Sequence, residues 1–266
     1  MVKLYFFGKD KRSKYLKEMY EQKKEDSNIE IVDSVENSDV FVLPIPFTKD
    51  GSYITGENIL IEELISKCKY KIVITGGIKD EFKEKMRDEN IKCVDLMELD
   101  EIAYLNAIPT AEGAIKCAMD NTDFTIHGAN IMVLGFGRVG KILADKLKGL
   151  NANVFCEARN KKDLAHIQAL GYNVVELNNI TEVIGNMDII FSTIPAVILD
   201  EEKIKLLDKN TVIIDLASAP GSVDYIACEK YGIKAYLELG IPSKVAPYSA
   251  AKYLKQSMDS VIYNKT

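Results

Sequence analysis

The chain has 266 residues, of which 47% are hydrophobic and 28% are charged, and its 34 basic and 40 acidic side chains give a formal net charge of −6. This length and composition are typical of a globular protein of about two domains, and they exclude disordered and fibrous proteins. The acidic balance disfavours a general binder of nucleic acid or of anionic membranes, because such proteins need a basic face.

Signals for targeting, membrane insertion and metal binding are missing from the sequence. The apolar run within residues 1–8 is too short for a signal peptide, and nowhere do 18 apolar residues follow one another. The five cysteines are an odd number, lie far apart and form no Cys-x-x-Cys pair, so neither a zinc site nor a redox dithiol is expected. We therefore expect a cytoplasmic protein with reduced thiols, no metal and no membrane partner.

Short apolar runs alternate with longer amphipathic ones, a pattern that predicts parallel α/β units. In the first part, strands are expected at 3–7, 29–32, 40–43, 71–75 and 92–95, and helices at 13–24, 58–68 and 80–89, the last with Asp80 as its N-cap. In the second part, strands are expected at 131–134, 153–156, 173–176, 188–193, 211–216 and 234–237. Helices are expected there at 138–150, 161–170, 180–185, 200–207 and 222–231, with a terminal helix near 247–263.

A glycine motif marks the second part, where a predicted strand runs into Gly-x-Gly-x-x-Gly and then into a helix. In that context the first glycine allows a tight turn, the second lets the backbone approach a pyrophosphate, and the third lets the helix pack closely on the strand. The helix N-terminus offers N–H groups and a positive dipole end to the phosphates. The motif predicts a dinucleotide site, with a ligand-free turn as the alternative. Its residues are Gly135, Phe136, Gly137, Arg138, Val139 and Gly140.

These observations predict two doubly wound parallel-sheet α/β domains joined by a helix, the second being a Rossmann dinucleotide-binding domain. We expect an N-terminal flavodoxin-like or Rossmann-like substrate domain at 1–108, and the nucleotide-binding domain with the connecting helix at 109–246. Pro109 suits the first turn of that connecting helix. The terminal helix, 247–266, is free to pack back on the first domain.

The residues after the second strand of the Rossmann domain bear on the choice of cofactor. NAD enzymes usually carry an acidic residue there, and the spacing places that position at Ala158. The next residue, Arg159, has two N–H donors for a 2′-phosphate, and Asn160 could add a bond, which favours NADP. A slip of one residue would instead bring the carboxylate of Glu157 to the ribose and select NAD. A surface role for Arg159 is the remaining alternative.

Small residues and prolines gather at other strand ends, on the edge where an open parallel sheet binds its ligand. They suit a flat nicotinamide ring that lies against backbone, although each is also ordinary turn chemistry. The cofactor candidates at these ends are Thr193, Ile194, Pro195 and Ala217.

No catalytic acid or base is evident. His127 precedes the strand of the glycine motif, and His166 is expected on the outer side of the domain, so neither is expected at a nicotinamide ring. Hydride transfer with little need for a strong protein base is therefore favoured. The turn at 75–77 predicts an anion-accepting loop, with a plain turn equally supported. The substrate candidates are Thr75, Gly76, Gly77, Thr110, Glu112, Ser218, Pro242, Lys244 and Ser249.

Several of these segments together resemble the family formed by the A subunits of dipicolinate synthase. The matching runs are Ile-Pro-Thr-Ala-Glu-Gly-Ala-Ile at 108–115, Thr-Asp-Phe-Thr-Ile-His-Gly at 122–128, the glycine motif within 133–140, Ala-Arg at 158–159, Thr-Ile-Pro at 193–195, Asp-Leu-Ala-Ser-Ala-Pro-Gly at 215–221, Gly-Ile-Pro at 240–242 and Val-Ala-Pro at 245–247. The resemblance is dense over 106–250 and weak over the first hundred residues. The chain departs from the family at Glu157, where family members carry Gly, at Ser243 and at Ser222.

The resemblance implies an NADP-linked oxidation of dihydrodipicolinate, a small dicarboxylate from the lysine pathway, to pyridine-2,6-dicarboxylate. It also implies that the partner is the flavoprotein-like B subunit of dipicolinate synthase, and that the location is the mother-cell cytoplasm of a sporulating bacterium. A homo-oligomer is compatible with the sequence. Two alternatives stay open: a dinucleotide-binding regulatory or scaffold subunit, and a dehydrogenase of another small carboxylate.

Overall fold

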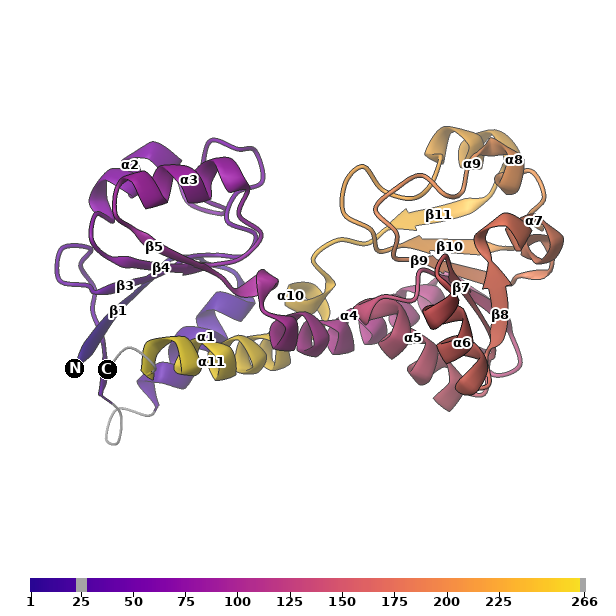
Figure 1. The fold of residues 1–266 in the computed structure, drawn as a ribbon, viewed down its shortest axis with the longest axis horizontal. Coiled ribbons are helices and arrows are strands. Elements are labelled where there is room, and N and C mark those ends of the chain that lie inside the picture. The colour runs from indigo at the N-terminus through magenta and orange to yellow at the C-terminus, as the bar shows by residue number, and fades with distance from the viewer. Residues whose placement is uncertain (23–27, 264–266) are drawn as a thin grey trace. The chain divides into compact units, whose positions relative to one another are not determined.

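The computed structural model of the chain describes residues 1–22 and 28–263. The chain divides into two compact units, which we call unit 1 (Met1–Asn106 with Ala246–Thr266) and unit 2 (Ala107–Val245). Each unit contains one parallel sheet with helices on both faces (Figure 1). The predicted fold class, two doubly wound parallel-sheet α/β domains, is therefore confirmed. Helix α4 (Asp100–Asp120) contributes residues to both units and joins them.

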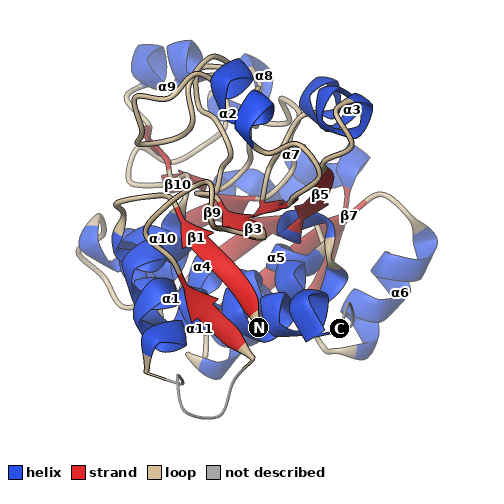
Figure 2. Ribbon diagram, turned by 90° about the vertical axis from the view of Figure 1, so that its left-hand side faces the viewer, coloured by secondary structure: helices blue, strands red, loops and turns tan. Residues whose placement is uncertain are grey.

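Unit 1 holds a five-stranded sheet in the order β2-β1-β3-β4-β5, and every pairing is parallel. Its strands are β1 (Val2–Phe6), β2 (Ile29–Ile31), β3 (Val40–Val42), β4 (Ile72–Thr75) and β5 (Lys92–Asp95). Its helices are α1 (Lys11–Glu21), α2 (Ile61–Lys67), α3 (Asp80–Asp88) and the terminal α11 (Pro247–Tyr263). Helices α1 and α11 lie side by side (Figure 1, Figure 2), so the end of the chain returns to unit 1.

Alternating side chains along the strands of unit 1 separate its two apolar layers. Phe41 on β3 packs with α2 and α3 through residues such as Leu64 and Phe82. Its neighbour Val42 packs on the opposite face with α1 and α11, where Leu254 is 2% exposed. This two-residue period, with both faces covered, is the burial pattern of a doubly wound sheet.

Unit 2 holds a six-stranded parallel sheet in the order β11-β10-β9-β6-β7-β8. Its strands are β6 (Asn130–Leu134), β7 (Asn153–Ala158), β8 (Asn173–Glu176), β9 (Ile189–Ser192), β10 (Val212–Asp215) and β11 (Lys234–Leu237). Its helices are α5 (Arg138–Gly149), α6 (Lys161–Ala169), α7 (Ile180–Val183), α8 (Glu201–Ile204), α9 (Tyr225–Tyr231) and α10 (Ile241–Val245). The direction of winding reverses beside β6, the place where sheets of this kind bind their ligands.

The core of unit 2 again has two layers. Ile131 and Val133 face α4, α5 and α6, whereas Met132 and Leu134 face α7, α8 and α9, and all four are fully buried. Short 3-10 helices lie at Leu96–Glu98, Leu177–Asn179 and Ile184–Asn186. No helix in the described part of the chain is long and apolar enough to cross a bilayer.

The structure corrects the predicted start of the connecting helix. Helix α4 begins at Asp100 rather than at Pro109, which lies inside it. The acidic residues Asp100 and Glu101 occupy the first turn, where negative charge favours helix formation. Pro109 therefore removes one backbone hydrogen bond from within the helix.

Several helix ends also differ from prediction. Asp80 is the first residue of α3 and not its N-cap, because the N-cap is Lys79, which makes no side-chain capping bond. Helices predicted at 58–68, 180–185, 200–207 and 222–231 are shorter, and α10 was not predicted. The predicted helix 13–24 ends at Glu21, and its last two positions lie outside the described residues.

Candidate functional site

The glycine turn after β6 shows why two of its positions accept only glycine. Gly135 has a φ of +91°, and a Cβ there would lie 2.6 Å from Oγ1 of Thr193. A Cβ on Gly140 would lie 2.0 Å from the backbone oxygen of Gly135. Helix α5 therefore packs directly on the turn, and its first residues face the carboxyl edge of the sheet.

The N-terminus of α5 has room for a ligand. Its N-cap is Gly137, which supplies no side chain to bond the first amides of the helix. A Cβ built on Gly137 meets nothing within 4 Å, so the space beside it is open. Amides at the positive end of a helix that no side chain caps can donate hydrogen bonds to phosphate oxygens. This end of α5 therefore fits the pyrophosphate of a dinucleotide.

Strand β7 runs two residues further than predicted and carries Glu157 to the glycine turn. The Glu157 side chain is 1% exposed, and its Oε2 accepts a hydrogen bond of 3.0 Å from the Gly135 amide. Its Oε1 has no hydrogen-bond partner in the described structure. Burial raises the pKa of this carboxyl, while the Gly135 bond and the charge of Arg159 act in the opposite direction.

The neighbours of Glu157 have different roles. Arg159 is exposed after the end of β7, and its charge reaches Glu157, as expected for side chains on the same side of a strand. Asn160 is the N-cap of α6: its Oδ1 accepts from the Asp163 amide at 2.8 Å, and its Nδ2 donates to the Asp163 carboxylate at 2.7 Å. Arg159 thus remains the candidate for a 2′-phosphate, whereas both polar atoms of Asn160 are engaged in capping.

At the end of β10, a buried carboxylate that sequence reasoning missed orders the loop containing Ala217 and Ser218. Asp215 is 0% exposed and accepts hydrogen bonds from the amides of Ala217 (3.0 Å) and Ser222 (2.9 Å). The Ser222 hydroxyl at 2.8 Å and the Tyr225 hydroxyl at 3.1 Å also donate to it. The run of small residues after an aspartate was the available signal for this arrangement.

The other cofactor candidates on this edge also contact the glycine turn. Oγ1 of Thr193 donates to the backbone oxygen of Leu134 at 3.0 Å. Ile194 is 7% exposed and lies within 3 Å of a Cβ built on Gly135, and Pro195 follows it at the surface. The structure therefore brings the ends of β6, β7 and β9 together around one turn.

The turn at Thr75, Gly76 and Gly77 in unit 1 behaves differently. The Thr75 hydroxyl is buried and donates to the Pro44 carbonyl at 2.9 Å. The amides of Gly77 and Ile78 both donate to the carboxylate of Asp95, at 3.1 and 2.9 Å. Because the protein's own aspartate takes these donors, the structure favours the plain turn over the predicted anion-accepting one.

The remaining substrate candidates are divided between the two units. Glu112 pairs with Lys146 at 2.9 Å, and Lys244 pairs with Glu238 at 3.4 Å. Helix α10, which contains Pro242 and Lys244, packs closely on α4, because a Cβ on Gly113 would lie 2.2 Å from Ile241. Unit 1 contains Thr75, Gly76, Gly77 and Ser249, and unit 2 contains Thr110, Glu112, Ser218, Pro242 and Lys244.

The two histidines lie on different parts of unit 2. His127 is exposed and precedes β6, at the amino end of that strand. His166 is exposed on α6, and its ring packs edge-on against Phe136 of the glycine turn, with 5.7 Å between the ring centroids. His166 therefore lies nearer to the predicted cofactor site than the sequence suggested.

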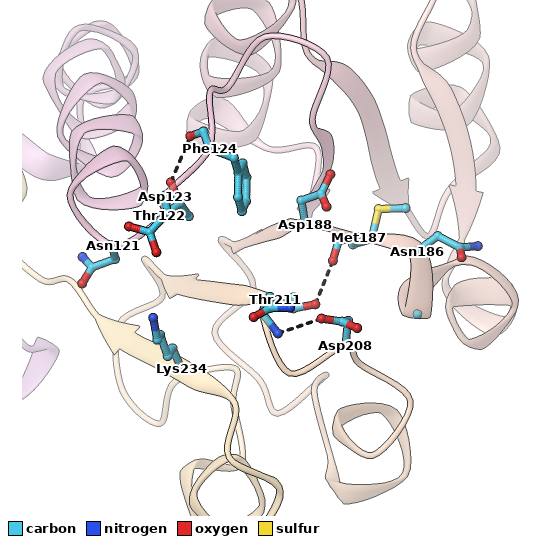
Figure 3. A pocket seen from close by; sticks show the side chains of 12 residues that line it. Asn121, Thr122, Asp123, Phe124, Asn186, Met187, Asp188, Asp208, Thr211 and Lys234 are labelled. Atoms are coloured by element: carbon cyan, nitrogen blue, oxygen red, sulfur yellow. Dashed lines mark hydrogen bonds between the residues drawn. The ribbon is translucent and has the colours of Figure 1, made fainter.

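A pocket of about 520 Å³ opens on the opposite edge of the unit 2 sheet, before β9, β10 and β11 (Figure 3). Two of its polar groups bond to the protein itself: Asp188 accepts from the Asn130 amide at 2.7 Å, and the Thr211 hydroxyl donates to the Met187 carbonyl at 2.8 Å. Within the described residues, no group of His, Cys, Asp or Glu could hold a metal ion. The pocket is thus separate from the glycine turn, although Thr122, Asp123 and Phe124 in its lining belong to the matching run at 122–128.

Comparisons with known proteins agree with this geometry. The family described as D-isomer specific 2-hydroxyacid dehydrogenase, NAD binding domain, matches residues 110–224. This region is therefore a nicotinamide-dinucleotide-binding domain of the dehydrogenase type.

Relatives that match both units identify the family. The A subunit of dipicolinate synthase from Bacillus subtilis is 35% identical over 230 residues, covering 84% of this chain and 77% of that protein. The crystal structure of the same subunit from Bacillus halodurans superposes with a TM-score of 0.87 and 32% identity, covering 98% of this chain and 97% of that one. The crystal structure of the Bacillus subtilis protein gives a TM-score of 0.87 at 28% identity, covering 99% and 96%. The chain belongs to the family of dipicolinate synthase A subunits.

Proposed function

We propose that the chain is the dehydrogenase subunit of a dipicolinate synthase and oxidises a dihydrodipicolinate to pyridine-2,6-dicarboxylate with NADP. Membership of the family, at 35% identity over 84% of the chain, is the observation that carries this proposal. The open N-terminus of α5 beside Gly137 supports it, because a pyrophosphate fits there.

The chemistry needs little from the protein beyond positioning. NADP⁺, when bound, accepts a hydride at C4 of its nicotinamide ring. The dihydropyridine would give that hydride to the nicotinamide and one proton to solvent. The product ring becomes aromatic, so the substrate itself supplies driving force. The N-terminus of α5 then holds the dinucleotide. The hydrogen bonds of Asp215 fix the loop after β10, which shapes the carboxyl edge of the sheet where the substrate is positioned. No histidine is required as a base.

The preference for NADP over NAD rests on Arg159. Its guanidinium follows β7 at the position where a 2′-phosphate is bound in related folds, and the neutral Ala158 leaves no carboxylate there. Partnership with the flavoprotein-like B subunit of dipicolinate synthase, and a role in sporulation in the mother-cell cytoplasm, are further parts of the same proposal.

Calorimetric titration of the purified chain with NADPH and NADH tests the cofactor. Arg159→Ala should weaken NADPH binding about 10- to 100-fold, since a hydrogen bond to a charged group contributes about 1.5–3 kcal/mol, and should leave NADH binding unchanged. The matched control is Arg87→Ala, which removes an exposed arginine of α3 in unit 1. A preference for NADH that does not depend on Arg159 would contradict the NADP proposal.

Turnover tests the reaction. The chain, mixed with the flavoprotein-like partner and freshly generated dihydrodipicolinate precursor, should produce NADPH and dipicolinate in equal amounts. The match to 2-hydroxyacid dehydrogenases favours a second candidate, the oxidation of another small carboxylate. NADPH production from a 2-hydroxy acid, with none from the dihydropyridine, would replace the first proposal by the second.

A further inference from the structure

The buried carboxyl of Glu157 has no role in the proposed reaction, yet it lies against the cofactor turn. It is 1% exposed, one oxygen is held by the Gly135 amide at 3.0 Å, and the other has no partner in the described structure. A buried acceptor without a donor is costly, so the site is incomplete as it stands.

We propose that Glu157 takes up a proton from solvent when NADPH binds, so that the affinity of the chain for the 2′-phosphorylated cofactor falls as pH rises. This inference rests on the proposed function, because it requires the dinucleotide to lie on the turn between Gly135 and Gly140. A protonated Glu157 keeps Oε2 as the acceptor for the Gly135 amide, and its Oε1, which no donor reaches in the described structure, is then no longer part of a buried charge.

The charges around the turn give the direction of the effect. In the free protein, the Gly135 amide and the Arg159 guanidinium support the ionised form of Glu157 against the cost of burial. A bound dinucleotide brings a pyrophosphate to α5 and a 2′-phosphate of charge about −1.5 to −2 to Arg159. Negative charge beside a buried carboxylate raises its pKa, and the new phosphate also screens it from Arg159. Protonation removes the repulsion between the two anions.

Other titratable and charged groups lie near this part of the sheet, and their contribution to any proton uptake must be distinguished from that of Glu157. Lys141 on α5 pairs with Asp163 on α6 at 3.5 Å, so their charges largely offset each other. His166 is the most relevant of them, since its ring contacts Phe136 of the turn. Besides β6, the elements packed against β7 are α5, α6 and β8. Their charged or titratable side chains are Arg138, Lys141, Asp145, Lys146, Lys148, Lys161, Lys162, Asp163, His166 and Glu176.

Calorimetry with NADPH in two buffers of different ionisation enthalpy counts the protons directly. The wild-type chain should take up a substantial fraction of one proton at pH values between the pKa of Glu157 in the free chain and its higher pKa in the complex. Its dissociation constant should rise there by up to about tenfold per pH unit. The 2′-phosphate titrates near pH 6, but pairing with Arg159 makes it release protons, the opposite sign. NADH, which lacks that phosphate, should give a smaller uptake.

Two variants locate the proton. Glu157→Gln should abolish the uptake and flatten the pH profile of NADPH binding, because it keeps an acceptor for Gly135 but cannot titrate. His166→Gln should retain the uptake, and it keeps the test decisive if the Glu157 variant fails to fold. Uptake that disappears with His166, or no net uptake in the wild type, would overturn the inference.

Failure of the inference is distinguishable from failure of the proposed function. NADPH binding without proton exchange removes the role of Glu157 and leaves the NADP proposal intact. Binding of neither nucleotide removes both. Tighter binding of NADH, lost in Glu157→Gln, would show an ionised Glu157 accepting from the ribose, and would overturn the inference together with the NADP preference.

Discussion

The two units have the same architecture, yet their carboxyl sheet edges differ in how the protein uses its own carboxylates. In unit 1, Asp10 caps α1 by accepting from the amides of Arg12 and Ser13. Asp95 accepts from two amides in the turn after β4 and from the Met97 amide that follows β5. In unit 2, the helix after the glycine turn has no such cap, and Glu157 takes only one amide. A glycine turn therefore becomes an anion site only where no side chain of the protein already satisfies it.

The largest effect should come from filling the open end of α5. Gly137→Ala adds a methyl group where the structure has nothing within 4 Å and where φ is −79°, so folding should be unchanged. That methyl group occupies the space through which the pyrophosphate approaches. We expect the dissociation constant of the dinucleotide to rise about tenfold to hundredfold, a loss of about 1.4–2.8 kcal/mol of binding free energy. Titration with NADPH and a thermal melt measure the two quantities.

The matched control for that variant is Gly140→Ala. Its Cβ would lie 2.0 Å from a backbone oxygen, so overpacking should cost roughly 2–3 kcal/mol of stability as well as binding. Full NADPH affinity in Gly137→Ala would contradict the contrast between the open turn of unit 2 and the closed turn of unit 1, since the pyrophosphate would then not lie at the N-terminus of α5.

A second variant tests the closed turn of unit 1. Asp95→Ala removes the acceptor of the amides of Gly77, Ile78 and Met97, of which the Ile78 bond is buried. Leaving buried donors unsatisfied costs about 1–3 kcal/mol each, so a total of about 3 kcal/mol is expected in urea unfolding. NADPH affinity should stay within about twofold, since Asp95 belongs to unit 1. A comparable loss of NADPH binding would refute the division of roles between the two turns.

The features that the sequence predicted well are local ones. The strand, glycine turn and helix at 131–150 follow one another along the chain, so their residue types alone specify the turn. The alternation of strands and helices was also predictable. Both faces of the sheet are buried, so each strand and each helix has an apolar pattern that can be read from its own residues.

The features that were missed depend on contacts between distant residues. Glu157 reaches Gly135 because β6 and β7 pair with Leu134 beside Glu157, a register that composition does not reveal. Asp95, 18 residues further along the chain, accepts a hydrogen bond from the Gly77 amide. The turn that was predicted as a possible anion site is therefore a plain turn. The prediction from Pro109 was wrong for another reason: proline is common in the first turn of a helix, but here it lies inside α4, which begins nine residues earlier at Asp100.

The smallest effect should appear in the stability of the free protein, and it sharpens the contrast between Asp95 and Glu157. Because burial raises the pKa of Glu157, the folded state binds this proton more tightly than the unfolded state, whose pKa is about 4.3. Stability is therefore lost as pH rises from that value through the folded pKa, and Glu157→Gln avoids the loss. The variant should melt like the wild type near pH 4 and up to a few degrees higher at pH 8, since 1 kcal/mol shifts the midpoint by about 2–4 °C. The exposed Glu182→Gln is the control, and a lower midpoint for Glu157→Gln at pH 8 would mean that Arg159 and the Gly135 amide outweigh the cost of burying the charge.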